Sequence, residues 1–123
     1  MAVALGAVIG YQRERVGKAA GVRTHILVSS GAGLFTLASI YGFGGAAVDI
    51  SRVAAAVVVG VGFIGGGVIF RGERGEEVAG LTTAATIWMT AAIGLAAGAG
   101  MYLISVIATA VIVGILLLPK VRG

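Results

Sequence analysis

The sequence predicts an all-α integral membrane protein: a helical bundle of about five transmembrane helices forming a single domain over residues 1–123, with the first helix truncated. Residues 78–119 contain no formal charge over 42 residues. As one helix this run would extend about 63 Å, twice the roughly 30 Å of a bilayer's hydrocarbon core. Hydrophobic residues make up 59% of the chain and charged residues 11%, against about 45–50% and 25% in soluble domains. Residues 78–119 therefore form two membrane-spanning helices.

The charge spacing places each helix in order. The first apolar segment would cover only about 16 Å as a helix, half of a bilayer, and we expect it to be the second half of a helix whose start is missing. Two further uncharged runs, of 25 and 18 residues if His25 is neutral, provide one span each. The last run should turn at Gly98-Ala99-Gly100, because glycine ends helices readily. The expected helices are residues 1–11, 26–43, 52–70, 79–97 and 101–118.

The distribution of basic residues predicts the orientation. Lys and Arg are enriched in cytoplasmic loops next to membrane spans. Four basic residues follow the first helix, one precedes the third, two follow the third and two follow the fifth, so alternate sides carry eight and one. We therefore expect the N-terminus outside the membrane and the C-terminus in the cytoplasm.

Several function classes are excluded by composition and motif context. The chain has no cysteine, and its net charge of +4 comes from residues between hydrophobic spans, so no basic domain exists to bind nucleic acid. Residues 60–65 match the GxGxxG letters of dinucleotide sites, but they lie inside an apolar run without a βαβ unit. No Ser/His/Asp set or metal-ligand spacing is present, so we expect no enzyme activity and no cofactor.

Small residues at four-residue spacing indicate close helix packing, because they let backbones approach each other in a membrane. Gly62 and Gly66 have this spacing in the third helix, and Gly6 and Gly10 repeat it in the first. We expect these positions to face other helices.

The fourth helix has the strongest packing pattern, a ridge of small or hydroxylated residues at i+4 spacing that we expect to face protein, within the bundle or between chains. Its members are Thr82, Thr86, Thr90, Gly94 and Gly98. The alternative for the threonines is that each hydroxyl bonds to the carbonyl four residues earlier. Ala91 and Ile93 lie off the ridge, where lipid contact is expected, and Trp88 is expected in the core.

Ionisable residues at the span edges are the remaining site candidates. Asp49 and Arg52 precede the third helix, where an Asp or Ser cap with an i,i+3 ion pair is the simpler interpretation. The functional alternative is an acid that meets a cation at the mouth of the bundle, which makes Asp49 a weak candidate magnesium ligand.

A basic loop between the first two helices is expected to face the cytoplasm and anionic lipid. It contains Arg13, Glu14, Arg15, Lys18 and Arg23. His25 follows where the second helix enters the membrane, and we expect it to cap the helix or to snorkel toward the interface.

Four segments, taken in order and spacing, resemble the membrane domain of the MgtC/SapB family. They are residues 9–14 (IGYQRE), 21–25 (GVRTH), 60–69 (GVGFIGGGVI) and 80–88 (GLTTAATIW). The resemblance covers residues 5–118 and implies a multi-pass protein of the bacterial inner membrane linked with growth in low magnesium. We expect no soluble C-terminal domain after Arg122, unlike the longer members. Arg13, Glu14, Arg23, His25, Asp49 and Arg52 fall on patterned positions of the family.

The resemblance implies a regulatory or interaction protein that packs against itself or against another membrane protein, such as a subunit of the proton-driven ATP synthase, within the lipid bilayer. The alternative is a component that transports magnesium or another ion. Intramembrane charges normally mark ion routes, and the three complete central spans contain none apart from His25 at an edge. The first interpretation is therefore favoured.

Overall fold

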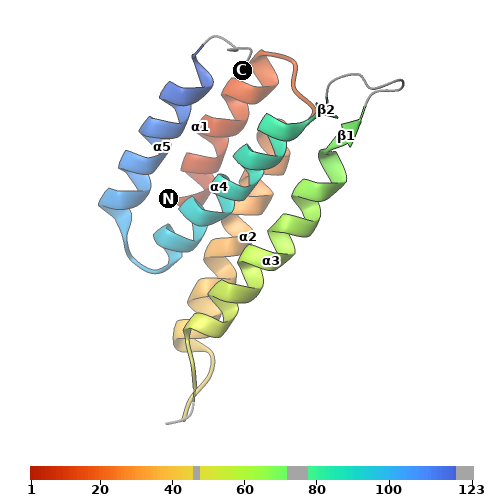
Figure 1. Ribbon diagram of the computed structural model, residues 1–123. Coiled ribbons are helices and arrows are strands. Elements are labelled where there is room, and N and C mark those ends of the chain that lie inside the picture. Colours follow the sequence, from red (N-terminus) through yellow and green to blue (C-terminus); the bar gives the residue numbers. More distant parts are fainter. Residues whose placement is uncertain (46–47, 72–77, 119–123) are drawn as a thin grey trace.

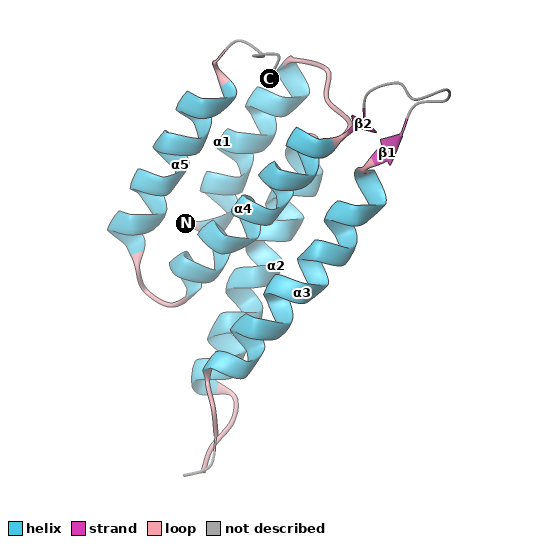
Figure 2. Cartoon of the chain, viewed as in Figure 1, coloured by secondary structure: helices cyan, strands magenta, loops and turns pink. Residues whose placement is uncertain are grey.

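The computed structural model describes residues 1–45, 48–71 and 78–118, which form five helices and one short antiparallel strand pair (Figure 1) (Figure 2). In chain order these elements are α1 (Ala2–Arg15), α2 (Val22–Tyr41), α3 (Ser51–Val68), β1 (Phe70–Arg71), β2 (Val78–Ala79), α4 (Leu81–Gly98) and α5 (Tyr102–Leu116). The five-helix prediction is confirmed. Helices α2, α3 and α4 are long and apolar enough to cross a membrane, and α5 is a shorter apolar helix.

The first helix extends one turn beyond the expected end near residue 11. The expected end lies where the charged residues begin, but Arg and Glu are good helix formers, so a charge by itself does not stop a helix. Gly17 stops it by adopting a φ of 76°, which residues with a Cβ avoid. The amide of Lys18 then donates to the carbonyl of Arg13 at 3.0 Å. Helix α2 likewise begins at Val22, four residues earlier than expected. Its first turn includes Arg23, and Arg is also a good helix former.

The connection between α3 and α4 differs from the expected end-to-end helices. Helix α3 ends at Val68, and the chain then pairs Phe70 with Ala79 and Arg71 with Val78 before α4 begins. Gly80 has a φ of 84° and lies so close to the carbonyl oxygen of Val68 that no Cβ would fit there. Residues 72–77, which make up most of the expected solvated turn, lie outside the described part of the structure.

The predicted turn at residues 98–100 is confirmed. Helix α4 ends at Gly98, and Gly100 has a φ of 87°. The amide of Met101 donates to the carbonyl of Ala96 at 2.9 Å, and the amide of Gly100 to that of Ala97 at 3.1 Å. These two bonds are the pair that defines a Schellman ending, which satisfies the last carbonyls of the helix.

Helix α4 is the centre of the bundle and contacts each of the other four helices (Figure 1). One apolar cluster joins it to α2 and α3 and contains Ala32, Val61, Ile87 and Ala91. A second joins it to α1 and α5 and contains Ile9, Ile93 and Ile112. The chain therefore builds its core around one helix that is surrounded on several sides.

This central position overturns three expectations about α4. Ala91 and Ile93 are buried, although both lie off the threonine and glycine ridge. Trp88, expected in the core, is 48% exposed. A helix that packs on several sides buries more than one stripe of residues, so the ridge alone does not divide the buried positions from the lipid-facing ones.

Candidate functional site

The ridge on α4 packs against α2 over two consecutive glycines. A Cβ at Gly94 would overlap the backbone of Ser29, its carbonyl oxygen first, and one at Gly98 would lie 2.6 Å from the carbonyl oxygen of Gly33. Gly33 in turn lies close to the carbonyl of Gly94. The two helices therefore meet backbone to backbone, which only residues without a side chain allow.

The threonines of the ridge behave differently from the glycines. Thr86 and Thr90 are buried, and their hydroxyls donate to the carbonyls of Thr82 and Thr86 respectively, each at 2.7 Å. This is the back-bonding that the sequence left open as the alternative. Thr82 is exposed at the end of the ridge. The hydroxyls of Thr86 and Thr90 thus donate their hydrogen bonds within α4 and not to another helix.

Helices α1 and α2 also meet through glycines. A Cβ at Gly6 would contact the Ser29 hydroxyl, and one at Gly10 would lie 2.5 Å from the Cα of Val22. The Ser29 hydroxyl donates to the carbonyl of Ala2 at 2.8 Å. The expected packing role of the two glycines is therefore seen in this helix pair.

A buried polar cluster joins α1, α2 and α4 at one end of the bundle. Arg13 lies in the last turn of α1 and is 3% exposed. Its Nη2 donates to Oγ1 of Thr83 in the first turn of α4 at 3.1 Å. His25, in the first turn of α2, is fully buried, and its carbonyl oxygen lies close to Gly6 of α1. Neighbouring Gln12 donates through Nε2 to the carbonyl of Leu116 in α5 at 3.4 Å.

The hydrogen bonds of His25 determine which ring nitrogen carries the proton. Nδ1 lies 2.8 Å from the carbonyl oxygen of Gly21. A carbonyl can only accept, so Nδ1 must hold the hydrogen, and neutral His25 then presents Nε2 as an acceptor. Within the described residues, Nε2 of His25 and Nε of Arg13 are both buried and unpaired. One is an acceptor and the other a donor, so the two atoms are chemically complementary.

Arg13, which was expected in a basic loop that faces the cytoplasm and anionic lipid, is instead buried. It is part of the buried face of α1, with Gly6, Ile9 and Gly10. These four residues have the i, i+3, i+4, i+7 spacing of one helix face, so the periodicity could have identified Arg13 as buried. Its partner Thr83 could not be found this way, because the two are 70 residues apart.

The other charged candidates of this end lie around the cluster. Glu14 and Arg23 are exposed. The side chain of Glu14 covers Gly21, where a Cβ would lie 2.5 Å from its Oε1. The first turn of α2 is thereby held against the last turn of α1, while Arg23 remains at the surface.

Asp49 precedes α3 at the opposite end of the bundle and forms no ion pair with Arg52. Its Oδ1 accepts from the amide of Ser51 at 3.0 Å and from the Ser51 hydroxyl at 2.7 Å. No ion pair joins Asp49 to Arg52 in the described chain, so that part of the prediction is wrong. The described residues also contain no group of three or more His, Asp or Glu side chains that could hold a metal ion. Within the described chain the carboxylate of Asp49 thus bonds only to Ser51, the first residue of α3, and the expected side-chain cap is not formed, because the N-cap position is Ile50.

Helix α3 presents its glycines differently from the expectation. Gly65 packs against Ala84 of α4, whose Cβ would lie 3.5 Å from an added Cβ. Gly62 and Gly66 are exposed, and no heavy atom of the described chain would lie within 4 Å of a Cβ at either position. On the same side, Val59 and Phe63 are 75% and 86% exposed. We call Val59, Gly62, Phe63 and Gly66 the open face of α3.

Residues 1–122 match the family model described as the MgtC family. The protein named "Putative magnesium transporter YhiD" of Escherichia coli K12 is 51% identical over 107 residues, which cover 82% of this chain and 48% of the relative. Protein SrpB of Synechococcus elongatus is 43% identical over 120 residues, covering 89% and 65%. Protein MgtC of Brucella abortus is 42% identical over 120 residues, covering 96% and 49%.

The chain therefore spans about half to two thirds of the length of these curated relatives. No solved structure matches it.

Proposed function

Because the chain belongs to the MgtC family, we propose that it is a multi-pass protein of the bacterial inner membrane that regulates another membrane protein complex by packing against it. The observation that carries this proposal is the open face of α3. Helix α3 has the smallest buried share of the three candidate spans, 17% against 33% for α2 and 50% for α4. A span with so little contact inside its own chain has surface left for a partner.

The chemistry of the open face suits a helical partner. Lipid tails are as apolar as Val59 and Phe63, so apolar contact alone gives no preference for protein over lipid. Gly62 and Gly66 add what lipid cannot use, a bare stretch of backbone that a second helix can approach closely. We propose a transmembrane helix as the occupant, from a subunit of the proton-driven ATP synthase or from a second copy of this chain.

A link to magnesium limitation is part of the proposal and rests on the relatives. YhiD carries magnesium transport in its name. That name also supports the second candidate function, a magnesium transporter component. Protein-dependent magnesium flux in reconstituted liposomes would favour transport over regulation by contact.

Leucine at Gly62 is expected to weaken partner binding without unfolding the chain, because no atom of the described residues lies within 4 Å of the new Cβ. The measurement is photo-crosslinking in native membranes, with the crosslinker at Phe63. In cells starved of magnesium, the Phe63 position should crosslink to an ATP synthase subunit or to a second copy, and Gly62→Leu should reduce that yield about ten-fold or more, the loss expected from about 1.4 kcal/mol of binding energy.

Gly114→Leu is the matched control, since Gly114 of α5 is also exposed with open space around its Cβ. It should leave the crosslink unchanged, and a crosslinker at exposed Ile115 should yield lipid adducts only. Equal yields from the two glycine variants, or lipid adducts alone at Phe63, would contradict the proposed role of the open face.

The proposed orientation places the loop between α1 and α2, and the C-terminus, in the cytoplasm. Its basis is the eight-to-one distribution of basic residues. A reporter enzyme that is active only in the cytoplasm should be active when it is fused after Lys18 and when it is fused after Gly123. A periplasmic signal at either position would reject the five-span arrangement.

A further inference from the structure

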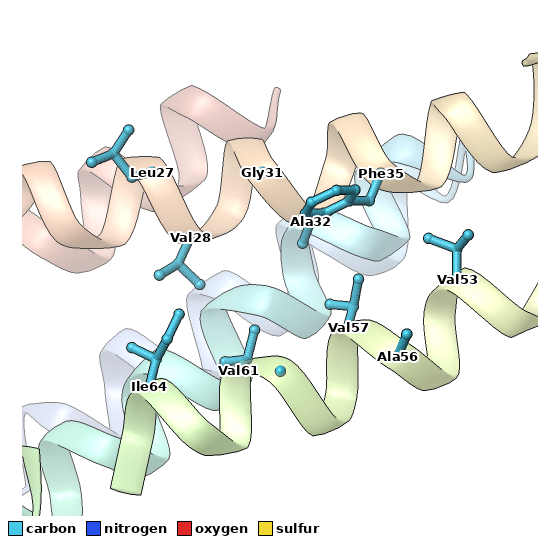
Figure 3. A pocket seen from close by; sticks show the side chains of 11 residues that line it. Leu27, Val28, Gly31, Ala32, Phe35, Val53, Ala56, Val57, Val61 and Ile64 are labelled. Atoms are coloured by element: carbon cyan, nitrogen blue, oxygen red, sulfur yellow. The ribbon is translucent and has the colours of Figure 1, made fainter. Parts of the chain in front are cut away.

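A groove of about 510 Å³ runs between α2 and α3 (Figure 3). Each wall is a ridge of residues at i+4 spacing: Leu27, Gly31 and Phe35 on α2, and Ala56, Gly60 and Ile64 on α3. All six wall residues are apolar or glycine. At Gly31 and Gly60 an added Cβ would meet no atom within 4 Å, so the two glycines widen the groove at its middle.

The base of the groove is closed by α4. Ala32 and Val61, which line the groove, also pack with Ile87 and Ala91 of α4. Helices α2 and α3 each contact α4 more extensively than they contact each other. The groove therefore has walls from α2 and α3 and a base on α4, and it is open on the side away from α4.

The two ends of the groove differ in charge. One turn before Leu27, the α2 ridge continues to Arg23, which is exposed. One turn before Ala56, the α3 ridge continues to Arg52, also exposed. Arg52 shares its end with the carboxylate of Asp49, whereas Arg23 shares its end with one exposed carboxylate, Glu14, and with two basic residues, Arg15 and Lys18. The Arg23 end is therefore the more positive of the two.

We propose that this groove binds one acyl chain of an anionic phospholipid, with the lipid phosphate at Arg23 in the cytoplasmic leaflet. The volume lies within the roughly 300–1,000 Å³ of ligand sites, and basic positions between spans on the cytoplasmic side suit anionic headgroups. The side chains that line the groove are all apolar, which suits the hydrocarbon of an acyl chain. The site is separate from the open face of α3, so it does not depend on the proposed partner contact, and only its placement in the cytoplasmic leaflet rests on the orientation proposed above.

The test uses the full chain with one tryptophan on the groove wall, made by Phe35→Trp together with Trp88→Phe. The protein is reconstituted in phosphatidylcholine vesicles containing a small fraction of phosphatidylglycerol brominated near the chain end. Arg23 lies 12 residues from position 35, about 18 Å along a helix, so bromine in a chain anchored at Arg23 reaches the probe. We expect apparent binding of brominated phosphatidylglycerol about five-fold stronger than that of brominated phosphatidylcholine.

Variants in this background separate the headgroup site from the acyl site. Arg23→Gln should remove the preference for the anionic lipid, and Arg52→Gln should leave it. Gly60→Leu, which fills the groove, should lower quenching by both lipids. Gly62→Leu, two residues away and outside the groove, should not. Circular dichroism checks that helix content is unchanged, and Gly31→Leu repeats the block from the other wall if Gly60→Leu does not fold.

Three results would overturn the proposal. The first is equal quenching by the two lipids in the parent protein, and the second is a preference that survives Arg23→Gln or is lost with Arg52→Gln. The third is quenching in the Gly31→Leu and Gly60→Leu proteins equal to that in Gly62→Leu.

Discussion

Leucine at Gly94 is expected to destabilise the bundle by about 3 kcal/mol, the upper end of what overpacking usually costs. The new side chain would overlap the carbonyl and Cα of Ser29, which are backbone atoms of α2. Backbone cannot rotate away as a flexible side chain can, so α2 and α4 would have to separate. Reversible unfolding in detergent, followed by circular dichroism, measures the loss.

Ala92→Leu is the control for this prediction, because Ala92 is exposed on the same helix two residues away. It should change the unfolding free energy by less than about 0.5 kcal/mol, as expected for a surface substitution. Ala91 and Ile93 would be poor controls, since both are buried. Equal stability of the Gly94 and Ala92 variants would show that α2 and α4 do not approach closely in the membrane protein.

Thr83→Val is expected to destabilise the chain by about 2–3 kcal/mol, because it keeps the shape of the side chain but removes the acceptor of a buried guanidinium. Arg13 is 3% exposed, and Thr83 accepts from its Nη2. Losing this partner leaves a charged donor buried without compensation. Thr82→Val, at the exposed neighbouring position, should be nearly neutral in the same unfolding measurement.

The double variant Arg13→Met with Thr83→Val should be more stable than Thr83→Val alone. Replacing both partners of a buried polar pair by apolar groups removes the unpaired donor that the single variant leaves. A double-mutant cycle isolates this coupling between α1 and α4. Strictly additive effects would mean that Arg13 and Thr83 do not interact.

The helix count was predictable from the sequence because membrane spans are determined by local properties. A span needs a run of apolar residues of a certain length, and charges or turn glycines mark its ends. The turn at Gly98-Ala99-Gly100 was located correctly for the same reason, since the positive φ of Gly100 is a preference of one residue type. The ends of α1 and α2 were misplaced because helices continue past the membrane boundary where the residues favour a helix.

The candidate site was only partly predictable. The i+4 ridge of α4 identified Gly94 and Gly98 as contact positions, since close packing leaves a spacing that is visible in one helix. The same spacing suggested Gly62 and Gly66, which are open. A small residue lets a second helix approach closely but does not ensure that a helix lies there. The i+4 spacing alone therefore could not distinguish the packed glycines of α4 from the exposed glycines of α3.

That this chain is a bundle of apolar helices follows from its residues alone, because length and hydrophobicity are properties of each segment. The central place of α4, the burial of Arg13 against Thr83 and the open face of α3 became visible only in the folded chain. These features depend on which helices are neighbours. In a membrane, apolar surface does not choose between a helix and lipid, so the neighbours follow from close packing and buried hydrogen bonds between residues far apart in the chain.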